Sequence, residues 1–229
     1  MIKGVIFDFS GTLFRVEPTA DWLSAVAAGA GTAATAAELA VWAERLEEAG
    51  ALPGGASPVR LPEELTELWE ARDLSAEDHR AVYTALTRGS GLPWPELVEP
   101  LYERHYTPAA WQPYPDTVST LRELRERGVP VAVVSNIGWD LRPVFRHHGV
   151  DGLVDAYVLS YEEGVQKPDA SIFATACEAL GLPPEAVLMV GDSREADGGA
   201  AALGCRVHFV EHLPVGERPD GLAEVLRLL

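Results

Sequence analysis

Several residue types and patterns are scarce in this chain, and their scarcity excludes whole classes of protein. Cys177 and Cys205 are the only cysteines among 229 residues, and their spacing matches no metal-binding motif. We therefore expect two buried, reduced thiols in a cytoplasmic protein. No apolar run approaches the roughly 20 residues of a membrane-spanning helix. Asp8 also ends the first apolar run before it reaches the length of a signal peptide's apolar segment, so we expect no membrane partner.

Positive charge is scarce as well. The 18 lysines and arginines face 35 acidic residues, which gives a formal net charge of −17. A field of this sign repels nucleic acids and anionic membranes, so neither is expected as a partner. It also repels phosphorylated substrates, so a phosphate site would need local cations of its own. Lys3 and Lys167 are the only lysines in the chain, which makes Lys167 informative.

The residues that are present predict an α/β fold. Apolar residues make up 47% of the chain, and five short, nearly continuous apolar segments occur at residues 2–9, 129–135, 153–159, 186–191 and 204–210. Such runs are typical of strands that are buried on both faces of a parallel sheet. Between the later segments, helical patterns cover residues 116–127, 169–180 and 193–203. This alternation predicts an open, doubly wound, Rossmann-like sheet.

The first strand is followed by about a hundred residues without a strand signal. Helical patterns occur there at residues 19–28, 35–49, 62–72, 76–88 and 95–105. The simplest interpretation is a helical domain at residues 16–110, inserted into an α/β core formed by residues 1–15 and 111–229. Within the insert we expect His79 and His105 to be solvent-exposed helix residues.

Polar side chains gather where the predicted strands end. In an open α/β sheet, ligands bind outside the carboxyl ends of the strands, and these ends carry Asp8, Ser135, Asn136, Asp192 and, slightly further on, Lys167 and Asp197. Two neighbouring carboxylates repel each other unless a cation lies between them, and oxygen ligands of this kind favour Mg²⁺. Gly11 permits a sharp turn after Asp8. An aspartate in such a place can act as a nucleophile that forms a covalent intermediate.

These residues form a recognisable pattern. The segments Asp8-Phe-Ser-Gly-Thr-Leu13, Ser135-Asn136, Lys167-Pro168 and Gly191-Asp-Ser-Arg-Glu-Ala-Asp197 resemble, in this order, the four motifs of the haloacid dehalogenase superfamily of hydrolases. The resemblance covers residues 1–14 and about 111–215. The helical insert looks like the cap that these enzymes carry between their first two motifs.

The resemblance implies a role for each matching residue. Asp8 would be the nucleophile, and Asp8, Asp192 and the backbone carbonyl of Ser10 would hold Mg²⁺. Lys167 would bridge Asp8 and the transferred group, with Asp197 supporting it. The substrate-binding residues would be Gly11, Thr12, Ser135 and Asn136, and the substrate a small phosphorylated metabolite.

Ser10 departs from the family pattern. Phosphatases of this family usually carry a second aspartate at this position, which protonates the leaving oxygen and then activates water. A serine hydroxyl is too weak an acid for this work, and general acid–base catalysis is worth about 10²–10⁴ in rate. A water molecule, Ser10 itself or a cap residue such as His79 or His105 could supply the function instead; this is a hypothesis.

The sequence therefore favours a Mg²⁺-dependent phosphatase that works through an aspartyl-phosphate at Asp8. One alternative is a dehalogenase-like hydrolase with an ester intermediate at Asp8, although the metal carboxylate Asp192 counts against it. Another is a catalytically impaired phosphate-binding or regulatory protein, which only Ser10 supports. A phosphonatase is excluded because the insert contains no lysine for a Schiff base. The oligomeric state stays open between a monomer and a homodimer.

Overall fold

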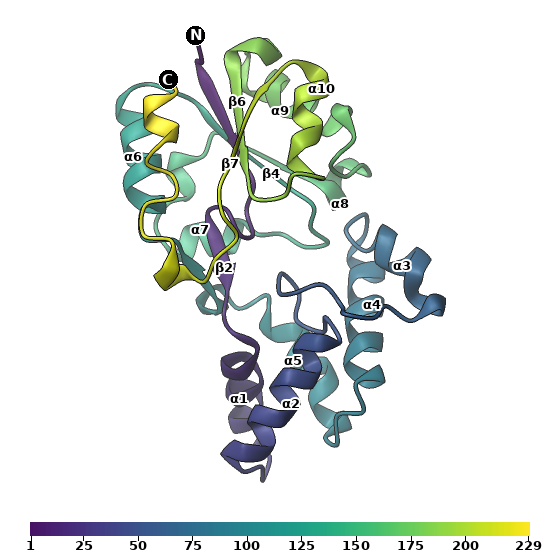
Figure 1. The fold of residues 1–229 in the computed structure, drawn as a ribbon. Coiled ribbons are helices and arrows are strands. Elements are labelled where there is room, and N and C mark those ends of the chain that lie inside the picture. Colours follow the sequence, from purple (N-terminus) through teal and green to yellow (C-terminus); the bar gives the residue numbers. More distant parts are fainter.

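A computed structural model describes all 229 residues of the chain. A parallel sheet of five strands, in the order β5-β4-β1-β6-β7, forms its upper part (Figure 1). The strands are β1 (Gly4–Phe7), β4 (Val131–Ser135), β5 (Ala156–Leu159), β6 (Val187–Gly191) and β7 (Arg206–Phe209). Each lies within one of the five predicted segments, so the predicted α/β fold class is confirmed.

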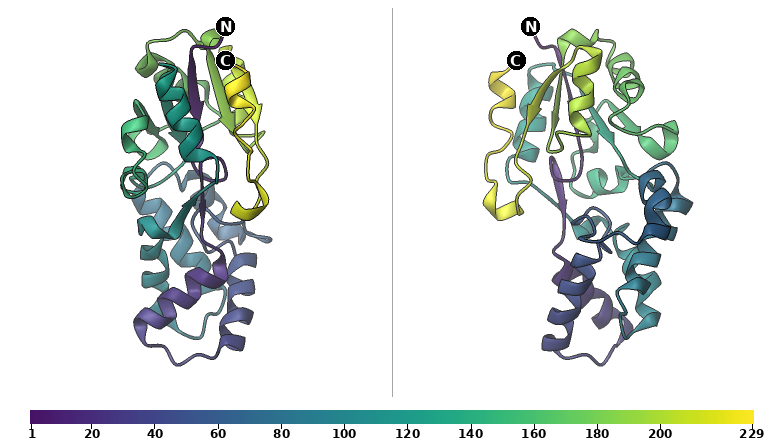
Figure 2. Two further views of the ribbon diagram at one scale, coloured as in Figure 1. Left: turned by 90° about the vertical axis from the view of Figure 1, so that its left-hand side faces the viewer. Right: turned by 45° about the vertical axis from the view of Figure 1, so that its right-hand side comes forward.

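Helices cover both faces of the sheet. Because alternate residues of a strand point to opposite faces, β1 contributes Val5 and Phe7 to one apolar core and Ile6 to the other. The helices α6 (Thr117–Glu126) and α7 (Arg142–His147) supply the first core, and α9 (Ala170–Leu180) and α10 (Ala200–Leu203) supply the second (Figure 2). This is the doubly wound arrangement that the continuous apolar runs predict.

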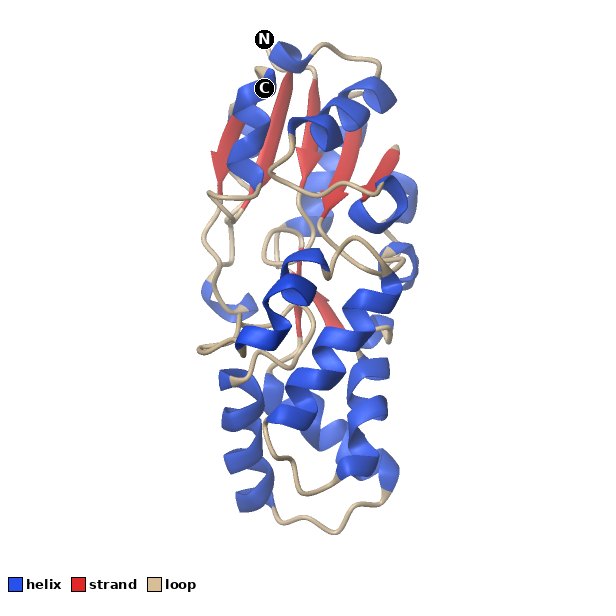
Figure 3. Ribbon diagram, turned by 90° about the vertical axis from the view of Figure 1, so that its right-hand side faces the viewer, coloured by secondary structure: helices blue, strands red, loops and turns tan.

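Five helices follow the first strand and lie beyond the carboxyl ends of the sheet. They are α1 (Thr19–Ala30), α2 (Ala36–Glu48), α3 (Thr66–Ala71), α4 (Ala76–Gly89) and α5 (Val98–Arg104). Figure 3 shows the arrowheads of the sheet strands pointing toward this helical segment. Helix α2 begins at a capping box in which Thr35 and Glu38 satisfy each other's backbone N–H groups. Two ion pairs of Arg80, to Glu99 and Glu103, join α4 to α5.

A two-stranded antiparallel ribbon links the helical segment to the sheet. It pairs β2 (Phe14–Val16) with β3 (Trp111–Pro113), and the sequence patterns did not predict it, because three residues are too few to show a period of two. The two strands of the ribbon include residues 15 and 111, which are the positions where the sequence places the limits of the inserted domain. The division into two domains stays a prediction.

Two further expectations about local structure are wrong. The helix predicted over residues 193–203 begins only at Ala200, after a 3₁₀ turn at Asp197–Gly199; the Asp197 carboxylate accepts the Ser193 N–H and holds the preceding residues in a loop. His79 and His105 are buried, with exposed fractions of 3% and 0%.

None of the helices combines the length and the apolar character that crossing a bilayer demands.

Candidate active site

Asp8 follows β1 directly, in the centre of the sheet, and a tight turn comes after it. The Phe9 carbonyl accepts backbone N–H groups of Leu13 and Phe14, both at 3.0 Å, and the Gly11 N–H donates to the Phe14 carbonyl at 2.7 Å. Gly11 has φ = 86°, a conformation that a side chain strains. The Ser10 carbonyl accepts none of the bonds that close this turn, and it stays available as a ligand.

Lys167 is buried beside Asp8, with 4% of its surface exposed. Its Nζ donates to Asp8 Oδ1 and to Asp197 Oδ1, each at 2.6 Å. The Asn136 side chain fixes the backbone of Lys167: Asn136 Oδ1 accepts the Lys167 N–H at 2.7 Å, and Asn136 Nδ2 donates to its carbonyl at 2.9 Å. The end of β4 therefore positions the ammonium group that neutralises the end of β1.

Asp192 follows β6 and completes a cluster of carboxylates. Its side chain and those of Asp8 and Asp197 each place an oxygen within 4.8 Å of the other two. The Thr12 hydroxyl lies between two of them, 3.3 Å from Asp8 Oδ2 and 3.4 Å from Asp192 Oδ1. Three acidic groups thus surround one ammonium group.

The excess of negative charge perturbs the ionisation of the site. Burial raises the pKa of Asp8 to about 7, against the pull of Lys167, and Asp197 and Asp192 push it the same way as burial. The charges of Asp197 and Asp8 outweigh the effect of burial on Lys167 and hold its pKa above the ordinary value. A divalent cation would offset the remaining charge and favour ionised Asp8. The donors are all oxygen atoms, which fits Mg²⁺.

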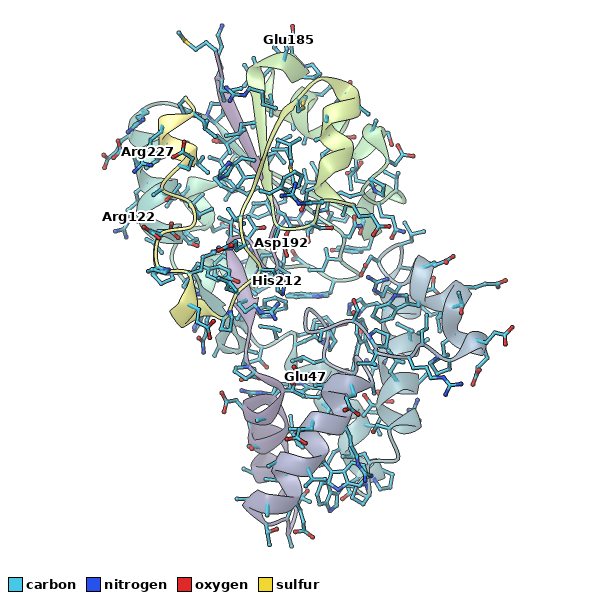
Figure 4. All side chains as sticks on the ribbon, viewed as in Figure 1. Glu47, Arg122, Glu185, Asp192, His212 and Arg227 are labelled. Carbon is cyan, nitrogen blue, oxygen red and sulfur yellow. The ribbon has the colours of Figure 1, made fainter.

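Sequence reasoning missed His212. Its Nδ1 contacts Asp192 Oδ2 and its Nε2 contacts the Arg15 guanidinium; Figure 4 shows Asp192 and His212 next to each other between the sheet and the helical segment. Burial would raise the pKa of Asp192, but the hydrogen bond and charge of His212 outweigh it, so the pKa lies below the ordinary value. His212 belongs to no motif, but its place just after the carboxyl end of the last strand is a signal that could have found it.

A cavity of about 160 Å³ lies between this cluster and the helical segment. The core contributes Ser10, Ser135, Asn136 and His212 to its lining, and the helical segment contributes Trp69, Arg72, Asp73, His79 and Tyr83. Phe9 and Ser10, the two residues after Asp8, are part of the cavity wall. Aromatic rings share this lining with several polar and charged side chains, which suits a small polar ligand.

The structure brings all nine predicted site residues to one end of the sheet, and the local contacts of these residues differ. Gly11 and Thr12 were predicted to bind substrate. The Gly11 N–H is occupied by Phe14, and Thr12 is fully buried with its N–H directed at the Phe9 carbonyl. Both residues shape the turn after Asp8, and their role in substrate binding stays a prediction. Ser135 and Asn136 do line the cavity.

A doubly wound sheet carries a central aspartate that a buried lysine contacts, and helices cover this site. The arrangement is that of a hydrolase. The family model described as haloacid dehalogenase-like hydrolase matches residues 2–204. The chain belongs to this family.

Relatives in the family have more than one activity. The chain is 31% identical over 202 residues to glyceraldehyde 3-phosphate phosphatase of Methanopyrus kandleri, which covers 86% of this chain and 78% of the relative. It is 33% identical over 127 residues to (S)-2-haloacid dehalogenase 4A of Burkholderia cepacia, over 51% of this chain and 54% of the relative, so the match spans about half of that protein. The crystal structure of a HAD phosphatase from Thermococcus onnurineus superimposes with a TM-score of 0.59 at 26% identity, covering 92% of this chain and 86% of the other.

Proposed function

We propose that the protein is a Mg²⁺-dependent phosphatase that acts on a small phosphorylated metabolite. The observation that carries the proposal is the position of Asp192, which offers an oxygen within 4.8 Å of Asp8 while Lys167 neutralises the other side of the nucleophile. A hydrolase that attacks carbon has no need of a second carboxylate at this place. The similarity to a phosphatase over most of the chain supports the same choice.

In the proposed reaction an Asp8 oxygen attacks the phosphorus atom, and the bond from phosphorus to the leaving oxygen breaks. The electron pair of that bond goes to the leaving oxygen, which needs a proton. Water then attacks the aspartyl-phosphate, and its attack releases phosphate and restores the Asp8 carboxylate. Splitting the reaction in this way replaces one difficult step by two easier ones.

The chain's own residues hold the phosphoryl group during both steps. Ser135 and Asn136 line the cavity, and the Ser135 hydroxyl and the backbone N–H of Asn136 would bind the phosphoryl oxygens, while Lys167 contributes its positive charge through its contact with Asp8. Asp8, Asp192 and the Ser10 carbonyl would hold Mg²⁺, which when bound supplies positive charge to the phosphoryl oxygens. The helical segment covers the site and excludes bulk water.

The test compares three groups of compounds with and without Mg²⁺: aryl and acyl phosphates, alkyl phosphates and 2-haloacids. We expect Mg²⁺-dependent phosphate release that disappears in Asp8→Asn. Magnesium affinity, measured by calorimetry, should fall in Asp192→Asn independently of turnover. Halide release that is indifferent to metal would instead establish the ester mechanism, and binding of phosphate without any turnover would establish a non-catalytic protein.

A further inference from the structure

The proposed phosphatase reaction lacks an identified proton donor. At Ser10 the hydroxyl donates weakly to the Gly54 carbonyl at 3.4 Å, and it cannot act as a carboxylic acid. The leaving oxygen would nevertheless depart into the cavity between Ser10 and the helical segment. Any replacement must therefore lie on the cavity wall, carry a transferable proton and regain that proton after each turnover.

His79 on α4 meets the first requirement. It lines the cavity although only 3% of its surface is exposed. The backbone of Gly138 packs so closely against it that a Cβ added there would lie 2.7 Å from His79 Cγ, so the ring is held in place. Its Nδ1 lies 2.9 Å from the Tyr102 hydroxyl, whereas its Nε2 has no protein partner. The ring thus has one nitrogen anchored in the helical segment and the other free for a ligand.

His105 does not meet this requirement. It is fully buried behind His79, with ring centroids 5.2 Å apart, and it is absent from the cavity wall. Its Nδ1 is taken by the Tyr102 carbonyl, and its Nε2 is buried without any partner. A proton on His105 therefore has no path to a substrate.

A chain of hydroxyl groups connects His79 with the surface. The Tyr102 hydroxyl lies 3.0 Å from the Tyr106 hydroxyl, and Tyr106 is half-buried at the edge of the helical segment. Burial raises the pKa of Tyr102, so its hydroxyl remains protonated and can donate. When Tyr106 donates to Tyr102 and Tyr102 donates to His79 Nδ1, the His79 proton lies on Nε2 and points to the cavity.

The surroundings favour a neutral imidazole. Burial, followed by the nearby His105 and Arg72, holds the pKa of His79 well below its ordinary value. A permanent imidazolium is thus excluded as the acid near neutral pH. A neutral ring can still deliver a proton if another proton reaches its second nitrogen in the same event.

Resting on the proposed phosphatase function, we propose that His79, supplied by Tyr102 and Tyr106, is the catalytic residue that replaces the missing motif acid. As the bond from phosphorus to the leaving oxygen breaks, that oxygen takes the Nε2 proton. Nδ1 takes the Tyr102 proton, Tyr102 takes the Tyr106 proton, and Tyr106 is reprotonated by solvent. No charge remains on the imidazole.

The same transfer prepares the second step. After it, the His79 proton lies on Nδ1, and Nε2 carries a lone pair that faces the cavity. Nε2 then accepts a proton from the water that attacks the aspartyl-phosphate, and the chain passes one proton back to solvent through Tyr106. One ring therefore performs the acid and the base work in alternate tautomers.

The experiment measures kcat/KM across phosphate esters whose leaving groups range from activated aryl to unactivated alkyl. His79→Asn keeps an acceptor near the Nδ1 position but removes the group at Nε2. We expect it to lose about 10²-fold on alkyl phosphates and to change little on activated aryl phosphates, because these leaving groups need no proton. Tyr102→Phe should show the same pattern, and His147→Asn, an exposed histidine on α7, is the matched control.

Rescue separates a catalytic from a structural role. Ser10→Asp, added to His79→Asn, should restore hydrolysis of alkyl phosphates, and thermal melting should show that both proteins are folded. The inference is overturned if His79→Asn lowers all esters by one factor or if Ser10→Asp restores nothing. Failure of the wild type on activated aryl phosphates would overturn the phosphatase function itself, which is a separate outcome.

Discussion

Two glycines allow the geometry around the metal ligands to be tested at the scale of single residues. Gly11 and Gly31 both have positive φ, at 86° and 68°. A Cβ at Gly11 would overlap the His212 ring and lie 2.5 Å from Asp192 Oδ2, whereas a Cβ at Gly31 meets nothing within 4 Å. The backbone strain is therefore comparable, and only the contact with the site differs.

Gly11→Ala should consequently weaken Mg²⁺ binding, while Gly31→Ala should not. Gly31→Ala should lose about 1 kcal/mol of unfolding free energy because alanine is strained at positive φ. Gly11→Ala should lose at least as much, because its Cβ also displaces the His212 ring. Titration calorimetry with Mg²⁺ and urea unfolding measure the two effects separately. Equal metal affinity in the two variants would show that the turn after Asp8 does not shape the cation site.

Lys167 provides the second test at this scale. Its ammonium group is the only protein cation in contact with Asp8 and Asp197, and removing one partner of a buried ion pair costs about 3–5 kcal/mol. Lys167→Met should lower the unfolding free energy by this amount in urea, and Asp197→Asn in the same chain should return part of it. Lys3→Met, at an exposed position, is the control and should change nothing.

Individual elements differ in how well the sequence predicts them. The strands and the residues at their ends are readable, because continuous apolar runs have one stable place in a parallel sheet and the topology then fixes where Asp8, Lys167 and Asp192 meet. The ribbon β2–β3 is too short to leave a pattern. The contacts of His79 and His212 depend on how segments twenty or more residues apart pack together, and local spacing carries no information about that.

His105, directly after helix α5, should make the stability of the fold depend on pH. Burial lowers the pKa of His105 from 6.5 to about 3. Between these two pH values the unfolded chain binds a proton on this histidine and the folded chain does not. Stability from this residue is complete above pH 6.5 and falls as the pH decreases, by about 1.4 kcal/mol per pH unit. Asp8 acts in the opposite direction, because its raised pKa favours the folded state at lower pH.

The difference between wild type and His105→Gln isolates the histidine contribution from that of Asp8. Urea unfolding at pH 7.5, 6.5 and 5.5 should show the wild type losing about 1 kcal/mol relative to the variant between the two lower values, because the unfolded histidine is already half protonated at pH 6.5. A constant difference across this range would mean that His105 takes up a proton as readily in the folded protein as in the unfolded chain.

In the whole molecule the helical segment lies against the carboxyl ends of the sheet and covers the site. On the side away from the ribbon, the Ser160 hydroxyl donates to the Asp73 carbonyl at 2.5 Å, and Gln166 Nε2 donates to the Glu70 carbonyl at 2.9 Å. The ribbon forms the covalent link on the other side. Two hydrogen bonds and the packing of Gly138 against His79 thus join the helical segment to the core in addition to the ribbon.

Gln166→Ala removes the hydrogen bond to the Glu70 carbonyl without disturbing buried groups. One hydrogen bond contributes about 1 kcal/mol, so the open arrangement should gain about fivefold in population. We expect KM to rise by up to about that factor and hydrogen exchange to accelerate in residues 66–73, while global unfolding changes by less than about 0.5 kcal/mol. Gln112→Ala, an exposed glutamine on the ribbon, is the control. Unchanged exchange in residues 66–73 would show that the two segments do not separate during turnover.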